Sequence, residues 1–247
     1  MANITDNLEG YWKMDEVSGT RVDATANDND LADNNTVGSA TGIINLGADF
    51  ESDNSEYLSI TDATQVGLDI TGDFSASYWL KVEEAPATNN ADVILGKWDS
   101  GGVNERAFYT IYRDTGGTKY LGMALSSDGT GGNSDTVLVA QTLTPGTLYH
   151  VVITFDVSSG TMEVFVDGSS IGTDTTAIGS IFDTPAPFTI GAAGNPSNYF
   201  DGIIDEVGVW SRILTDDEVE DLYNGGSGLA YPFTAGAATF VPTVMLI

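Results

Sequence analysis

The chain of 247 residues contains no cysteine, one histidine and only 8 basic residues against 36 acidic ones. Without cysteine the protein has no disulfides, no thiolate metal sites and no cysteine nucleophile. The single histidine, His150, excludes multi-histidine zinc sites and leaves one candidate base for a serine triad. The formal net charge of −28 at pH 7 disfavours binding to nucleic acids and to anionic membrane surfaces.

Long apolar runs are also missing from the sequence. No run of 18 apolar residues is present, which predicts that no helix crosses a membrane. The first ten residues have neither the basic nor the apolar segment of a secretion signal. The sequence as it stands therefore predicts a soluble protein that is made in a cytoplasm.

Short alternating segments bounded by turn residues occur along most of the chain. Residues 108–113 and 119–125 alternate on either side of a turn at 114–117, which predicts a β-hairpin. Residues 149–155 and 161–166 predict a second hairpin in the same way. Many short strands at a spacing of about 8–12 residues predict an all-β sandwich or barrel.

One helix is expected near the C-terminus. Thr215 and Glu218 have the spacing of a capping box, in which each side chain satisfies a backbone donor of the other residue. Val219 and Leu222 then form an apolar face, and the glycines at 225–226 are expected to end the helix.

Four segments occur in the order typical of one known family. They are LEGYWKMDEVSGT (8–20), FSASYWLK (74–81), LYHVVITFD (148–156) and FDGIIDEVGVW (200–210). With them, about residues 4–231 resemble a laminin-G-like, concanavalin A-like lectin/glucanase domain of the LamG or pentraxin-like type. The resemblance implies an all-β, two-sheet antiparallel jelly-roll β-sandwich with one short C-terminal helix. We expect one domain over residues 1–231 and an uncharged tail over 232–247.

The resemblance also implies glycan binding, because relatives bind glycans on the concave face and its rim loops. Sugar C–H faces stack on aromatic rings, so rings near strand ends are the candidates, together with neighbouring polar side chains. The expected carbohydrate-binding residues are Trp98, Tyr199, Phe200, Asn104 and Arg106, with Arg113 as a further polar candidate. The other tryptophans, Trp12, Trp79 and Trp210, lie in alternating strand patterns and are expected in the core.

Calcium is the metal that this sequence favours. The segment 23–30 is rich in carboxylate and amide oxygens, which are the ligands that Ca²⁺ prefers. Relatives often hold a structural calcium ion against the aspartate of the last core strand, which here matches Asp205. The resemblance thus implies Asp205 and Asp23 as metal ligands, with backbone oxygens near Gly47. The alternative is that segment 23–30 is a solvated turn.

A catalytic site is not expected. Related glycosidases carry a Glu-x-Asp-x-Glu motif on one strand, and this sequence lacks it. Asp205 and Glu206 are adjacent in a strand pattern, so their side chains are expected on opposite faces. His150 alternates with apolar neighbours, which favours a structural histidine hydrogen-bonded to a neighbour, and no serine lies in a nucleophile-elbow context.

The last sixteen residues, 232–247, carry no charged side chain. A free apolar end of this kind promotes aggregation, so we expect it to be covered. The cover is either the protein's own sandwich or another subunit, to which the tail could add as an edge strand. Phe240, Val244 and Leu246 are the expected contact residues.

These features predict a non-enzymatic, lectin-like surface module. Its partners would be glycans or another structural protein, in a homo-oligomer or a larger assembly. A virion structural or decoration protein of a capsid, fibre or tail fits the missing secretion signal and places the protein on a virion surface or outside the cell after release. The alternative is a secreted carbohydrate-binding module or adhesin, and a glycoside hydrolase is the third interpretation.

Overall fold

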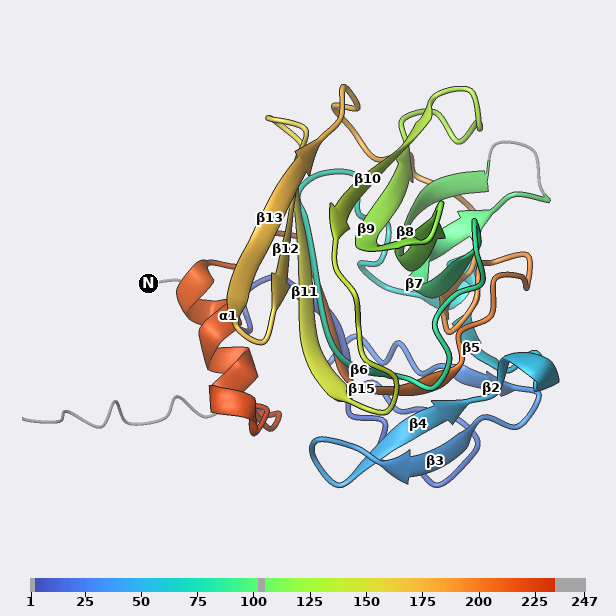
Figure 1. Ribbon diagram of the computed structural model, residues 1–247, viewed down its shortest axis with the longest axis vertical. Helices are drawn as coiled ribbons and strands as arrows, with labels where there is room; N and C mark the ends of the chain where they lie inside the picture. Colours follow the sequence, from blue (N-terminus) through green and yellow to red (C-terminus); the bar gives the residue numbers. More distant parts are fainter. Residues whose placement is uncertain (1–2, 102–104, 234–247) are drawn as a thin grey trace, which may run out of the picture.

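The computed structural model describes residues 3–101 and 105–233, which form two antiparallel β-sheets packed face to face (Figure 1). The first sheet contains β1 (Leu8–Trp12), β3 (Gly38–Thr41), β4 (Leu46–Phe50), β6 (Phe74–Val82), β11 (Leu148–Asp156), β12 (Thr161–Val166), β13 (Ser169–Thr175) and β15 (Gly202–Trp210). The second contains β2 (Ala32–Asn34), β5 (Tyr57–Ile60), β7 (Ala91–Asp99), β8 (Glu105–Thr115), β9 (Thr118–Ser126), β10 (Ser134–Ala140) and β14 (Phe188–Ile190). This all-β sandwich confirms the predicted fold class.

The strand order brings together segments that are far apart in the sequence. The eight-stranded sheet has the order β13-β12-β11-β6-β15-β4-β3, with β1 also paired to β15. The seven-stranded sheet has the order β10-β9-β8-β7-β14-β5-β2. The two predicted hairpins are confirmed as the pairs β8–β9 and β11–β12.

The single α-helix of the described residues, α1 (Asp216–Tyr223), begins at the predicted capping box. Thr215 accepts a hydrogen bond from the backbone of Glu218, whose side chain accepts one from Thr215. The predicted end is one residue late, because Asn224, with φ of 48°, adopts the left-handed C-cap conformation before the glycines. Short 3-10 turns occupy Ser52–Asn54, Asp62–Thr64 and Asn224–Gly226. No helix in the described ranges is both long and apolar enough to cross a bilayer.

Apolar side chains fill two separate regions. The main core lies between the sheets, where Trp12 is fully buried and stacks on Phe188 with 5.4 Å between ring centroids. A second cluster lies on the outer face of the eight-stranded sheet, where α1 covers Trp210 and Val152. Trp79 is buried on this face and stacks on Tyr223 of the helix. The prediction that Trp12, Trp79 and Trp210 are buried is confirmed, although only Trp12 lies inside the sandwich.

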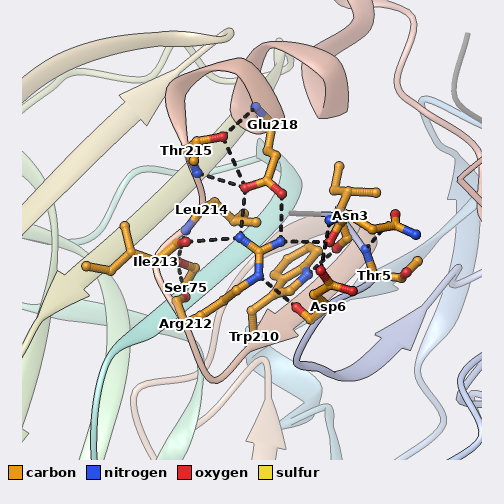
Figure 2. Close-up of polar contacts among 11 residues, drawn as sticks. Asn3, Thr5, Asp6, Ser75, Trp210, Arg212, Ile213, Leu214, Thr215 and Glu218 are labelled. Atoms are coloured by element: carbon orange, nitrogen blue, oxygen red, sulfur yellow. Dashed lines mark hydrogen bonds and ion pairs between the residues drawn. The ribbon is translucent and has the colours of Figure 1, made fainter. Parts of the chain in front are cut away.

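Arg212 joins the N-terminal segment to α1 directly after β15 (Figure 2). Its guanidinium makes two hydrogen bonds of 2.7 Å to the Glu218 carboxylate. It also donates to the backbone oxygens of Asn3, at 3.2 Å, and Asp6, at 2.7 Å. The Arg212 guanidinium thus links the capping residue Glu218 to the backbone of the N-terminal segment. Trp210 adds a second link, a hydrogen bond of 2.7 Å to the backbone oxygen of Ile4.

A β-bulge interrupts β15 at Asp205 and Glu206. The register with β6 shifts between Asp205 and Gly208, and Glu206 has a positive φ of 48°. Because Ile204 and Val207 both face the core, the two acidic residues between them lie on the outer side. The prediction that Asp205 and Glu206 point to opposite faces is therefore wrong.

His150 is a structural residue on β11, as predicted. It is 1% exposed, and its Nε2 lies 2.9 Å from the hydroxyl of Ser77 on β6. Its ring contacts both Trp79 and Tyr223, which also stack on each other. Burial lowers the pKa of the imidazole to about 3, so it is neutral at physiological pH.

Candidate functional site

A polar pocket of about 340 Å³ lies at one mouth of the sandwich, between the ends of the two sheets. We call it the edge pocket. Its lining comes from three stretches of chain, which are the segment after β4, the β6–β7 connection with the start of β7, and the segment before β15. The lining residues are Ser52, Glu84, Ala85, Pro86, Ala87, Asn90, Asp92, Asn198, Tyr199 and Asp201.

Hydrogen bonds between these segments hold the edge pocket in shape. The backbone and hydroxyl of Ser52 donate to the Asp201 carboxylate at 3.2 and 2.8 Å. Asn198 donates to the oxygen of Ala91 at 2.9 Å, and its own carbonyl accepts from Val93 at 2.9 Å. The segment before β15 is therefore fixed to both sheets, which makes the pocket a feature of the folded sandwich.

Asp92 is the buried acid of the edge pocket. It is the second residue of β7, is 7% exposed and pairs across the strands with Tyr112. Its carboxylate accepts no hydrogen bond from the described part of the chain, unlike that of Asp201. Burial raises the pKa of Asp92 to about 7, and the charge of Asp201 contributes in the same direction, while Lys119 opposes it.

Lys119, the basic residue whose charge acts on Asp92, already has other partners. Lys119 forms an ion pair of 2.9 Å with Asp114 and donates to the backbone oxygen of Pro86. Lys119 thus lowers the pKa of Asp92 through space without donating a hydrogen bond to it. The pocket wall therefore presents carboxylate and amide oxygens together with a tyrosine ring.

Two of the predicted carbohydrate-binding residues, Tyr199 and Phe200, belong to the segment before β15, and only the first of them lines the edge pocket. Tyr199 lines the edge pocket, is half-buried and lies 6.4 Å from the ring of Tyr57. Phe200 is 0% exposed and packs edge-on against Phe50 in the core. The prediction for Phe200 is wrong, because successive residues of an extended segment point in opposite directions and only Tyr199 faces outward.

The other candidates lie around Trp98 at the end of β7. Trp98 is only 8% exposed, because Tyr109 packs edge-on at 4.7 Å and the Arg106 guanidinium lies 5.9 Å from its ring centroid. The prediction that Trp98 offers an exposed ring is therefore wrong. Arg106 donates to the backbone oxygens of Ser100 and Gly129, and it does not line the edge pocket. Asn104 lies outside the described residues.

Sequence reasoning missed the polar half of the edge pocket. Asp92, Asp201, Asn90 and Asn198 belong to no motif, and their approach depends on which strands are neighbours. The one local signal is an acid at the start of an apolar strand, in the run Ala91-Asp92-Val93-Ile94-Leu95.

The two expected calcium ligands stand in different surroundings. The Asp23 carboxylate accepts hydrogen bonds from the backbones of Tyr11, Thr25 and Asn29 at 2.9–3.0 Å and from the Thr25 hydroxyl at 2.8 Å. Asp205 accepts from the backbones of Ile43 and Ile44, at 2.7 and 3.3 Å. Among the described residues no group of three or more His, Cys, Asp or Glu side chains is placed to hold a metal ion. A calcium ion shared by Asp23 and Asp205 stays a prediction.

Asp205 is a fully buried carboxyl group with a raised pKa. It is 0% exposed and lies beside Glu206, which is 4% exposed and bonded to the Tyr11 hydroxyl. Burial, followed by the charge of Glu206, raises the pKa of Asp205 to about 8, and burial raises that of Glu206 to about 7. Asp205 lies against Gly47, where an added Cβ would be 3.2 Å from the Asp205 Cβ, and the role of backbone oxygens there as calcium ligands stays a prediction.

Calcium binding at Asp205 stays a prediction, with a direct test. Millimolar calcium is expected to raise the melting temperature above the value in EDTA, because a cation offsets the buried negative charge. Asp205→Asn is expected to abolish this increase, whereas Asp23→Asn tests the other ligand separately. An equal melting temperature of the parent protein with calcium and with EDTA would contradict the prediction.

The start of the expected tail packs on its own domain. Phe233 contacts Tyr11 edge-on at 5.1 Å, and Tyr231 stacks on the same ring at 5.0 Å. The predicted contact residues Phe240, Val244 and Leu246 lie outside the described residues, so their role stays a prediction.

Two facing antiparallel sheets with a polar pocket at their mouth define a lectin-like β-sandwich. A family model described as the concanavalin A-like lectin/glucanases superfamily, of the laminin G type, matches residues 52–220. The chain belongs to this superfamily, as the sequence resemblance predicted. No curated protein matches the sequence.

Several solved structures share the fold. The binding domain of Paraclostridial mosquitocidal protein 1 has a TM-score of 0.67 and 15% identity, over 91% of this chain and 53% of its own. The binding domain of botulinum neurotoxin DC in complex with SialylT has a TM-score of 0.67 and 12% identity, over 90% and 52%. This chain thus spans about half the length of these toxin domains.

A third structure matches over nearly its full length. Domain 4 of AbnA, an extracellular arabinanase from Geobacillus stearothermophilus in complex with arabinotriose, has a TM-score of 0.58 and 19% identity. The match covers 87% of this chain and 97% of that domain. At these identities the likeness establishes the fold.

Proposed function

We propose that the protein is a non-catalytic carbohydrate-binding module whose edge pocket holds a sugar residue. The observation that supports this proposal is the combination, in one pocket, of the Tyr199 ring with carboxylate and amide groups. An aromatic ring suits the C–H face of a sugar, and carboxylates and amides bind its hydroxyl groups. The similar arabinanase domain was solved in complex with arabinotriose, which also supports carbohydrate binding.

The proposal of a non-catalytic role rests on how the acidic residues are placed. Asp205 and Glu206, the adjacent carboxyl pair, are almost fully buried and bonded within the fold, so a substrate does not reach them. The sequence lacks the Glu-x-Asp-x-Glu motif of related glycosidases. Incubation with the polysaccharides that bind, followed by an assay for new reducing ends, is expected to show no release of sugar.

Replacing Tyr199 with alanine tests the proposed pocket. Tyr199→Ala is expected to weaken binding of a bound oligosaccharide roughly 10-fold, as the loss of an aromatic anchor in a binding site does. A panel of neutral oligosaccharides that includes arabinotriose, followed by calorimetry, provides the measurement.

Tyr120→Ala is the matched control, because Tyr120 is a half-buried tyrosine of β9 that does not line the pocket. Equal weakening by both variants would place the binding site elsewhere. The roles as a virion component or as an adhesin, and the corresponding locations, stay predictions.

A further inference from the structure

Asp92 is an acid whose binding partner is missing from the described protein. It is 7% exposed, lines the edge pocket and accepts no hydrogen bond from the described residues. A buried carboxylate is costly unless donors or an opposite charge compensate it. A group that enters the pocket and carries hydrogen-bond donors therefore gains from contact with Asp92.

The walls of the pocket add to this negative charge. Glu84 and Asp201 line the same space. Within residues 3–101 and 105–233, Asp201 accepts hydrogen bonds from Ser52, whereas Glu84 accepts none. Lys119, the cation close enough to influence Asp92, is paired with Asp114. The pocket therefore disfavours acidic sugars and favours a ligand with positive charge.

We propose that the edge pocket binds a sugar bearing a protonated primary amine, with its ammonium group on Asp92 and its ring on Tyr199. This inference rests on the proposed carbohydrate-binding function and specifies its ligand class. An ammonium group has three donors and no acceptor, which matches a wall of carboxylate and amide oxygens. Asn90 and Asn198, which line the pocket next to Asp92, supply further acceptors.

Two other ligand classes fit less well. A divalent cation needs six or more oxygen ligands in its shell, and no cluster of three acidic or histidine side chains suited to a metal occurs among the described residues. A neutral sugar would cover Asp92 and remove it further from water without cancelling its charge. An ammonium ion needs only one close carboxylate and supplies that charge.

The test compares glucosamine oligomers with N-acetylglucosamine oligomers of equal length by calorimetry. The acetyl group removes the positive charge and leaves the ring in place. The parent protein is expected to bind the amine form at least roughly 10-fold more tightly, as charge-assisted hydrogen bonds are about twice as strong as neutral ones. Binding is expected to be equal in EDTA and in calcium.

Asp92→Asn is expected to remove the preference for the amine form while the affinity for the acetylated form stays within about threefold. Asp53→Asn is the matched control, because Asp53 is exposed, neighbours Ser52 and does not line the pocket. It removes the same charge nearby and is expected to keep the preference. Glu84→Gln, at an exposed wall position, is a second variant that leaves the fold intact and is expected to reduce the preference.

The outcomes separate this inference from the broader proposal. Equal affinity for both oligomers, or an amine preference that Asp92→Asn retains, overturns the amine assignment and leaves carbohydrate binding standing. Binding that requires calcium also overturns it. If no sugar of either kind and no neutral oligosaccharide binds, the carbohydrate-binding function itself fails.

Discussion

Glu218→Ala is expected to lower the free energy of unfolding by about 3 kcal/mol, which is the usual cost of removing one partner of a largely buried ion pair. The change removes both hydrogen bonds to Arg212 and the side chain that caps the backbone of Thr215. It leaves Arg212, whose side chain is 17% exposed, without its carboxylate. Urea unfolding followed by circular dichroism gives the measurement.

Glu220→Ala provides the control on the same helix, because Glu220 is exposed and is not among the described hydrogen-bond and ion-pair partners of Arg212. Its expected effect is within about 0.5 kcal/mol, as for other surface substitutions. Similar losses for both variants would mean that helix propensity, and not the link between Arg212 and Glu218, determines the stability of this region.

Acid is expected to destabilise the protein through His150. Its pKa is lowered by burial to about 3, below the ordinary value near 6.5 that the unfolded chain has. The native state therefore binds fewer protons than the unfolded state between these values, and stability falls as the pH falls. The expected loss is about 2 kcal/mol at pH 5 and about 4 kcal/mol at pH 3.

The raised pKa values of Asp205 and Glu206 have the opposite effect on stability, which they increase as the pH falls. Their contribution to stability is present below the ordinary carboxylate pKa and is lost as the pH rises through about 7 and 8. Comparison with His150→Gln isolates the histidine, because the acidic pair titrates in both proteins. The variant is expected to lose less stability on acidification than the parent.

Because His150 is the only histidine, its NMR signal reports the titration without ambiguity. The imidazole of the folded protein is expected to stay neutral down to about pH 4. A midpoint near 6.5 in the folded state would contradict the expected effect.

The sequence predicts the parts of this fold that local rules determine. Alternation and turn residues suffice for the β8–β9 and β11–β12 hairpins, and the spacing of Thr215 and Glu218 suffices for the start of α1. The bulge at Glu206 cannot be predicted from the sequence, because nothing in the residue pattern indicates that this glutamate adopts a left-handed backbone conformation. One inserted residue then moves two acids to the same face.

The candidate site is predictable only in part for a similar reason. Tyr199 stands out as an aromatic residue in a loop, and the structure places it in the edge pocket. Trp98 has the same local appearance, but Tyr109 and Arg106 cover it from the neighbouring strand. Asp92 belongs to no motif; strand pairing places it opposite Tyr112, and none of the described residues donates a hydrogen bond to it.

β15 connects the two ends of the molecule mechanically. Asp201, which lines the edge pocket, precedes this strand, and Arg212, which holds the N-terminal segment and α1, follows it. The strand's nine residues span roughly 27 Å, so a molecule tethered near residues 3–6 presents its pocket at the far pole. A pull between tether and ligand would run along β15. Its hydrogen bonds to β6, β4 and β1 lie across that direction and would share the load.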